Sequence, residues 1–302
     1  MKMVTIFTAF CAGSLATALV GCGTPATEPT AGQARQSDLG SLSDEFDNPS
    51  TLSNWQRVEK VEGWNNNQLQ TFDIGGTQNG WMTMMPYTST WYRDYRGILV
   101  FKPVDGDFVV TTKLHVTGRS GNGAPRSQFS LAGIMVRAPR NISPSTWRPG
   151  GENYVFLSLG AADQAGRYQF EVKTTVNSDS QLVTEPTTSG DAVIRVAKIG
   201  STMIMLKKVD GNWSVHRRYS RGDFPSTLQV GLTVYTDWPG ASRLSPQQQN
   251  STVIRNGSPD LLALFDYVRY ARPELPSTLR GRRLDDPGSV SDSQLLQFLG
   301  ND

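Results

Sequence analysis

Residues 193–213 have the sequence VIRVAKIGSTMIMLKKVDGNW, and this stretch decides the fold class. Its apolar runs, 192–199 and 202–209, are short, rich in Val and Ile, and without the three-to-four-residue spacing of an amphipathic helix. Asp210-Gly211-Asn212 is typical of the tight turn of a β-hairpin and joins the second run to residues 213–217. The stretch therefore predicts consecutive antiparallel strands.

Runs of the same kind recur through the body of the chain, which we place at residues 44–272. They are residues 98–102, 107–116, 129–137, 154–159, 167–176, 228–236 and 264–270. Within 167–176, Phe170 and Val172 fall on one face of a strand, while Glu171 and Lys173 fall on the other. A polar face of this kind is typical both of a solvated sheet and of a sheet that binds sugars, and the alternation leaves both open. Many short strands with Gly, Asp and Asn between them predict one all-β domain, an antiparallel sandwich or barrel.

The first 21 residues have the pattern of a secretory signal: Lys2, then no charge from Met3 to Val20. A single membrane-spanning anchor is the alternative, since the run is close to the minimum length for a bilayer span. Leu19-Val20-Gly21-Cys22 resembles the bacterial lipobox, which implies cleavage before Cys22 and a lipid on its thiol. Residue 23 is Gly rather than the Asp that retains such proteins at the inner membrane, so the resemblance implies a lipid-anchored protein of the cell envelope, at the outer membrane.

Composition limits the partners of the mature chain. Residues 22–43 are rich in Pro, Gly, Ser and Thr and predict a flexible tether. The cysteines are Cys11 and Cys22, so the body has neither a disulfide nor a cysteine-ligated metal. A formal net charge of +2 gives no case for nucleic acid as a partner.

The last segment, 273–302, predicts a polar connector followed by a short helix. Ser291 can cap the helix with Gln294 three residues later, and Leu295, Leu296, Phe298 and Leu299 form an apolar stripe. A helix this short is not stable alone in water. It should dock on its own domain or on a partner protein.

Several phrases, in order along the chain, give the body a family resemblance. They are DEFDNPSTLSNW (44–55), GILVFKPVDGDFVVTTKL (97–114), LAGIMVRAP (131–139), the opening stretch 193–213, LQVGLTVYT (228–236) and LFDYVRY (264–270). Together they resemble the concanavalin A-like lectin/glucanase superfamily, within it an uncharacterised bacterial domain related to the C-terminal sandwich of β-xylosidases. The resemblance implies two antiparallel sheets packed as a jelly-roll sandwich, with glycans bound by many members on the concave sheet.

The sequence lacks the catalytic motifs of glucanases and of serine hydrolases. Glucanases of this superfamily carry a Glu-x-Asp-x-x-Glu pattern on one strand, and no segment here has it. His115 and His216 fall in predicted strands, and a Gly-x-Ser-x-Gly motif does not occur. A structural calcium ion is the one cofactor considered, with Asp44, Asp47 and Asp266 as its ligands, because calcium prefers several oxygen ligands.

Aromatic residues in the predicted loops suggest a ligand surface, since sugar rings stack on aromatic faces while polar side chains take the hydroxyls. The set that we expect to face a glycan is Trp91, Tyr92, Arg137, Trp147, Glu171, Tyr235 and Trp238. The same aromatic residues also suit the ends of a sandwich core. Residues 239–260, directly after Trp238, predict a long polar loop, either a functional lid or a disordered insertion.

We therefore expect a membrane-tethered bacterial lipoprotein with a non-catalytic lectin-like domain that binds a polysaccharide or an envelope glycan. One alternative is a glycoside hydrolase or lyase of the same fold with an unfamiliar acid pair. Another is a structural envelope protein whose C-terminal helix docks on a partner.

Overall fold

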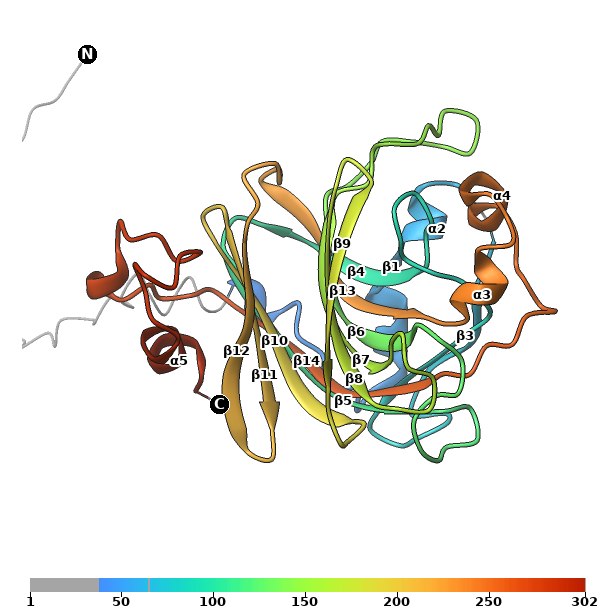
Figure 1. The fold of residues 1–302 in the computed structure, drawn as a ribbon, viewed down its shortest axis with the longest axis horizontal. Coiled ribbons are helices and arrows are strands. Elements are labelled where there is room, and N and C mark those ends of the chain that lie inside the picture. Colours follow the sequence, from blue (N-terminus) through green and yellow to red (C-terminus); the bar gives the residue numbers. More distant parts are fainter. Residues whose placement is uncertain (1–37, 65, 302) are drawn as a thin grey trace, which may run out of the picture.

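The computed structural model describes residues 38–64 and 66–301, and two antiparallel sheets of seven strands each pack face to face in it (Figure 1). The expected all-β antiparallel sandwich is confirmed. The signal segment 1–21, Cys22 and residues 23–37 of the expected tether lie outside the described residues. The body begins earlier than expected, because Leu39 is buried in the core and Asp38 pairs with Arg272 at 2.8 Å.

Each sheet is built from strands that are distant in the sequence. The first sheet runs β1 (Gln56–Arg57), β4 (Ile98–Asp105), β13 (Thr227–Tyr235), β6 (Ser130–Arg137), β7 (Tyr154–Ala161), β8 (Gln169–Val176) and β9 (Asp179–Pro186). The second sheet runs β12 (Asn212–Ser220), β11 (Thr202–Val209), β10 (Asp191–Ile199), β5 (Phe108–Thr117), β14 (Leu262–Ala271), β3 (Met82–Pro86) and β2 (Leu69–Ile74). The hairpin between β11 and β12 turns at Asp210 and Gly211, whose φ angles are +50° and +80°. The turn that the Asp-Gly pair predicts is thus present.

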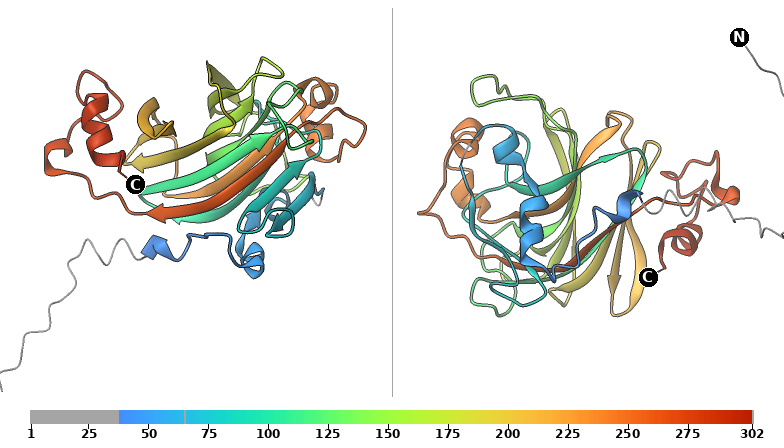
Figure 2. Two further views of the ribbon diagram at one scale, coloured as in Figure 1. Left: turned by 90° about the horizontal axis from the view of Figure 1, so that it is seen from below. Right: turned by 180° about the vertical axis from the view of Figure 1, so that it is seen from behind.

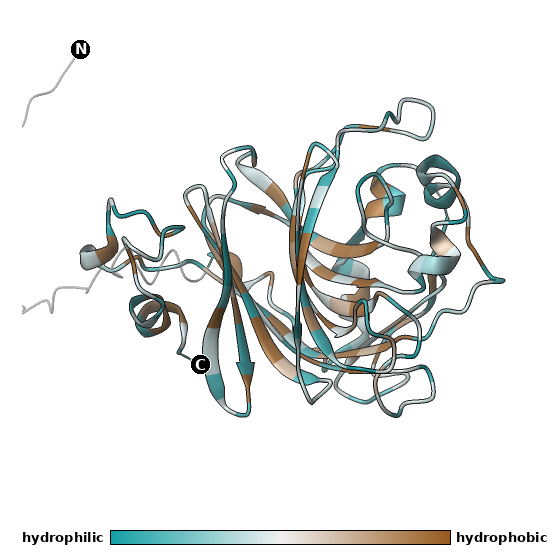
Figure 3. Ribbon diagram, viewed as in Figure 1, coloured by the Kyte–Doolittle hydropathy of each residue, from teal (hydrophilic) through white to brown (hydrophobic). Residues whose placement is uncertain are grey.

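The main core lies between the two sheets. Ile134 and Val172 of the first sheet and Val110 and Phe265 of the second belong to one buried apolar cluster. Apolar residues are concentrated along the strands, and polar residues in the connections (Figure 3). The period-two pattern of the sequence therefore correctly predicts which side chains of the strands face the core.

The outer face of the first sheet is covered, which the sequence did not predict. The loop 87–97, α2 (Val58–Val61), α3 (Trp238–Ala241) and α4 (Pro246–Asn250) surround it. Glu171 and Lys173 on this face are 0% and 2% exposed as side chains. The polar face of β8 is therefore neither solvated nor an open sugar-binding sheet, because other parts of the chain pack over it.

Residues 239–260 are ordered, so a disordered insertion is the wrong description of them. Ser245 caps α4 in a capping box with Gln248. At the end of α4, the Asn250 side chain accepts a hydrogen bond from the backbone N–H of Arg96 at 2.8 Å and donates one to the carbonyl of Asp94 at 2.9 Å. These bonds join the segment to the loop 87–97.

The C-terminal segment covers the outer face of the second sheet. After η2 (Ser277–Leu279), α5 (Asp292–Leu299) is capped by Ser291 and packs Leu295 and Leu299 against Ile204 and Leu206 of β11. The helix therefore docks on its own domain. It lies at the opposite end of the molecule from α3 and α4 in all views (Figure 2). Within the described part of the chain, the helices are all too short or too polar to cross a membrane.

A candidate glycan-binding pocket

A pocket of about 240 Å³ opens on the outer face of the first sheet. It lies between the loop 87–97, the hairpin of β8 and β9, and the start of α3. Its lining consists of Thr90, Tyr92, Phe129, Lys173, Leu182 and Trp238. Aromatic and aliphatic side chains thus form most of the wall, and one ammonium group lies among them. A few placed polar groups within an apolar wall are typical of small-ligand sites.

Trp238 is held in the wall by the residue before it. Asp237 is in the left-handed region, with φ at +65°, and its side chain caps the first turn of α3. Its carboxylate also accepts hydrogen bonds from the Thr88 hydroxyl and the Ser258 backbone N–H, both at 2.7 Å. The Asp237 side chain therefore has a structural role: it fixes the backbone at the start of α3, from which the Trp238 side chain extends.

Tyr92 forms the part of the wall next to Trp238. Its ring meets the Trp238 ring edge-to-face at 5.3 Å, and Tyr95 meets Trp238 in the same way at 5.6 Å. The neighbouring Trp91 side chain is fully buried and donates from Nε1 to the Ile98 carbonyl at 3.2 Å. A Cβ on Gly97 would lie 2.7 Å from the Trp91 ring, so the close approach of this indole requires glycine there.

Lys173 lies at the base of the pocket. Its Nζ donates to the Trp91 carbonyl at 2.6 Å and pairs with Glu171 Oε1 at 2.9 Å. The same ammonium lies near four aromatic rings, with centroid distances of 5.1 Å to Phe156, 5.4 Å to Tyr235, 5.6 Å to Tyr92 and 5.9 Å to Phe129. Burial lowers the pKa of Lys173, and the attraction of Glu171 opposes that shift.

Glu171 and Tyr235 lie below Lys173 and complete a buried polar cluster. Both side chains are fully buried, and Glu171 Oε2 has no hydrogen-bond partner among the described residues. The Tyr235 hydroxyl lies 3.2 Å from Ser158 Oγ. Burial, followed by the charge of Glu171, raises the pKa of Tyr235 well above its usual value, so this phenol stays neutral.

Arg137 and Trp147 belong to a separate, interior network. The Arg137 guanidinium pairs with Glu152 at 2.8 Å and with Glu62 at 2.6 Å, and donates to Gln229 Oε1 at 2.8 Å. Although burial alone lowers the pKa of Arg137, the two carboxylates raise it above its ordinary value. Trp147 is 6% exposed and packs on Trp64. These two residues therefore offer no surface to a ligand.

The carboxylates expected to hold calcium have protein partners. Asp44 accepts from the Phe46 backbone N–H at 3.0 Å and from Trp55 Nε1 at 3.2 Å. Asp266 pairs with Lys113 at 2.7 Å. In residues 38–64 and 66–301, no three His, Cys, Asp or Glu side chains are arranged to hold a metal ion. A calcium site at Asp44, Asp47 and Asp266 stays a prediction.

The structure brings together five of the seven residues expected to face a glycan. Tyr92 and Trp238 line the pocket, whereas Trp91, Glu171 and Tyr235 are buried beside Lys173. Sequence reasoning missed Lys173, Phe129, Leu182 and Thr90 as lining residues. Lys173 carried a usable signal, because it lies two residues from Glu171 on the same strand face.

Known proteins resemble this chain in their fold. No model of a known protein family matches the sequence, and neither does any curated protein. A functionally unknown protein from Saccharomyces cerevisiae has 14% identity and a TM-score of 0.50 over 74% of this chain and 98% of its own. The GH43 BlXynB protein from Bacillus licheniformis has 14% identity and a TM-score of 0.50, over 76% of this chain and 39% of its own. A β-glucanase from the same bacterium has 12% identity and a TM-score of 0.42, over 76% of this chain and 97% of its own.

The two similarities with a TM-score of 0.50 agree with the architecture described above. The chain has the two-sheet antiparallel jelly-roll sandwich of the concanavalin A-like type, as expected. It spans 39% of the GH43 protein, so that protein has a large part with no counterpart here. Identities this low establish the fold alone.

Proposed function

We propose that this protein is a non-catalytic, lectin-like lipoprotein that binds one sugar ring of a neutral glycan in the pocket lined by Tyr92 and Trp238. The observation that carries the proposal is the composition of that pocket: aromatic side chains form its walls, and the Lys173 ammonium lies at its base. The apolar CH face of a pyranose stacks on such rings, and an ammonium donates hydrogen bonds to sugar hydroxyls.

The charge of the site supports a neutral sugar. Lys173 is the charged residue of the lining, and its ammonium is 2.9 Å from Glu171 Oε1. The positive charge is therefore balanced within the protein, and a ligand carboxylate would meet little net attraction. A volume of about 240 Å³ is below the range of about 300–1,000 Å³ typical of drug-sized ligands and suits a single ring.

The state of the carboxylates supports binding rather than hydrolysis. Glycosidases need two carboxyl groups, about 5–5.5 Å apart for retention and about 6.5–9.5 Å apart for inversion. Glu171 is ion-paired with Lys173 below the pocket, and Glu62 and Glu152 are held by Arg137. Each of these groups already has a cation as its partner.

The lipid anchor is the second part of the proposal and comes from the sequence alone. A lipid on Cys22 would place the body on a bacterial envelope surface, at the outer membrane. Residues 23–37 would span at most about 50 Å when extended. Asp38, the first described residue, pairs with Arg272, directly before the C-terminal segment, and that segment lies at the opposite end of the molecule from α3 and α4. The pocket would therefore open away from the anchored end.

The test is a screen of neutral oligosaccharides against the purified chain, followed by titration calorimetry on any that bind. Trp238→Ala should weaken binding by about 2 kcal/mol, or roughly thirtyfold, because it removes one stacking wall. Trp81→Ala is the matched control: it is also a half-buried tryptophan, but it lies beside Lys113 on the second sheet. Absence of binding to every neutral oligosaccharide, or equal loss in both variants, would refute the proposal. Mass spectrometry of the native N-terminus tests the lipid on Cys22.

A further inference from the structure

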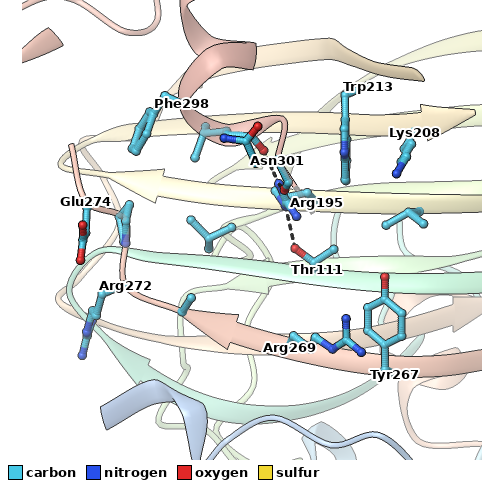
Figure 4. A pocket seen from close by; sticks show the side chains of 15 residues that line it. Thr111, Arg195, Lys208, Trp213, Tyr267, Arg269, Arg272, Glu274, Phe298 and Asn301 are labelled. Carbon is cyan, nitrogen blue, oxygen red and sulfur yellow. Dashed lines mark hydrogen bonds between the residues drawn. The ribbon is translucent and has the colours of Figure 1, made fainter. Parts of the chain in front are cut away.

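A second concave site lies on the opposite face of the sandwich and is not used by the proposed function. It is a groove of about 580 Å³ on the outer face of the second sheet, bounded on one side by the C-terminal segment. Figure 4 shows its floor at Thr111 and Arg195, with Trp213 and Tyr267 toward one end and Glu274 and Phe298 toward the other. All of these residues belong to the described part of the chain.

Strand register places the aromatic end of the groove in a single row across five strands. Trp213 of β12 pairs with Lys208 of β11, and Lys208 pairs with Val193 of β10. Val193 pairs with Lys113 of β5, and Lys113 pairs with Tyr267 of β14. Four strand spacings of about 4.8 Å separate the two aromatic residues by about 19 Å. This distance fits several sugar rings of an extended chain rather than one small molecule.

Each aromatic ring is paired with an arginine. The Arg195 guanidinium lies 4.4 Å from the centre of the Trp213 ring, and the Arg269 guanidinium lies 4.0 Å from that of Tyr267. Arg195 Nε also donates to Thr111 Oγ1 at 2.8 Å, which holds the guanidinium on the floor. Stacking fixes the orientation of the planar cation and keeps it beside the ring.

The lining is strongly basic. Four of its side chains are cationic, namely Arg195, Lys208, Arg269 and Arg272, and one is acidic, Glu274. Arg269 and Arg272 each have a carboxylate partner at 2.8 Å outside the lining, Glu45 and Asp38, yet the Arg269 side chain is 57% exposed. The ligand should therefore carry negative charge as well as flat apolar faces.

We propose that this groove binds an acidic polysaccharide, a chain of sugar rings bearing carboxylate or sulfate groups. The rings lie against Trp213 and Tyr267, and the acidic groups meet Arg195, Lys208 and Arg269. A planar membrane surface does not enter a groove closed on one side by the C-terminal segment. Single-stranded nucleic acid also uses aromatic and basic side chains, so a single-stranded DNA probe belongs to the test.

The experiment is titration of the full chain with alginate oligosaccharides and dextran sulfate, with neutral dextran as the reference. Saturable binding of at least one acidic probe is expected, and it should weaken between about 50 mM and about 500 mM salt because surface charges are screened. Trp213→Ala and Lys208→Gln should each weaken it at least fivefold. Trp238→Ala, which alters only the pocket on the first sheet, should leave it unchanged.

The proposal is overturned if no acidic probe binds, if binding survives both groove substitutions, or if a single-stranded DNA probe binds more tightly than either acidic glycan. Lys208→Gln guards against misfolding, since it leaves the Trp213 ring in place. Loss of acidic-glycan binding in Trp238→Ala but not in Trp213→Ala would also contradict it. Failure of neutral-sugar binding bears only on the pocket lined by Tyr92 and Trp238.

Discussion

Replacement of Lys173 by methionine tests whether the base of the pocket is a buried ion pair. The side chain is 2% exposed, and the single variant leaves Glu171, which is 0% exposed, without its partner. An unpaired charge in such a position costs about 3–5 kcal/mol of unfolding free energy. The hydrogen bond to the Trp91 carbonyl is lost as well, at about 1 kcal/mol. We therefore expect Lys173→Met to be destabilised by about 4–6 kcal/mol.

The double variant Lys173→Met/Glu171→Met separates stability from binding. With both charges removed and the volume kept, stability should return to within about 2 kcal/mol of the wild type, because apolar replacement of a buried pair is close to neutral. Neither the single nor the double variant should bind the sugar, because both lack the Lys173 ammonium. Urea unfolding followed by tryptophan fluorescence measures the first quantity, and titration calorimetry measures the second.

Lys113→Met is the control for this experiment. Lys113 pairs with Asp266 at 2.7 Å, but the two side chains are 47% and 31% exposed, so the loss should stay below about 1 kcal/mol. The reasoning fails if Lys173→Met costs no more than Lys113→Met. It fails equally if the double variant is as unstable as the single one, since the unpaired charge would then not be the cause.

Three further predictions concern the rest of the molecule. Burial, with Lys207 adding to it, lowers the pKa of His216 from 6.5 to about 4, so the unfolded chain binds a proton in that interval and the folded chain does not. The free energy of unfolding should therefore fall by up to about 3 kcal/mol as pH drops from about 6.5 to about 4. Urea unfolding at each pH measures this fall, and a His216→Phe variant should not show it. Gly133→Ala would place a Cβ 2.0 Å from the Leu157 carbonyl oxygen, so this variant should unfold at a much lower urea concentration than Gly222→Ala, whose added Cβ has no atom within 4 Å. Equal unfolding midpoints of the two variants would contradict the close packing of β6 on β7. Arg218→Ala removes donors to the carbonyls of Leu284 and Val290, so limited proteolysis should cut the C-terminal segment first and leave the sandwich intact; unchanged cleavage would show that these two hydrogen bonds do not hold the segment in place.

The strands that sequence patterns predict best are those buried on their inner faces. Residues 130–137 and 227–235 alternate or run apolar, and both are strands at the centre of the first sheet. β9, with the sequence DSQLVTEP, was missed because it is an edge strand without a fully buried side chain. Its two large apolar residues, Leu182 and Val183, are adjacent and fall on opposite faces, so the apolar residues do not alternate. The short strands β2 and β3 were missed as well.

The covered polar face of the first sheet was beyond sequence reasoning because distant segments produce it. Arg96 donates to Asn250 and Asn66, and these contacts span 154 and 30 residues of the chain. Burial lowers the pKa of Arg96 to about 10. Local patterns show that Glu171 and Lys173 share a face, but not that a loop from elsewhere closes over them. By contrast, the capping box at Ser245 and Gln248 was visible in the sequence and signals an ordered insertion.

Two of the residues that line the pocket were predicted from the sequence. Tyr92 and Trp238 were chosen as loop aromatics, and both line it. Trp91 and Tyr235 have the same residue types, yet they fill the interior, since composition cannot distinguish an aromatic wall from an aromatic core. Cys22 and the signal segment stay predictions, because they lie outside the described residues.

The most direct measurement of the central claim is a crystal structure of the protein soaked with the tightest-binding neutral oligosaccharide. The account predicts one sugar ring in the pocket, packed against Tyr92 and Trp238, with a ring hydroxyl within hydrogen-bond distance of Lys173 Nζ. An empty pocket together with an ordered sugar elsewhere on the sandwich would contradict it.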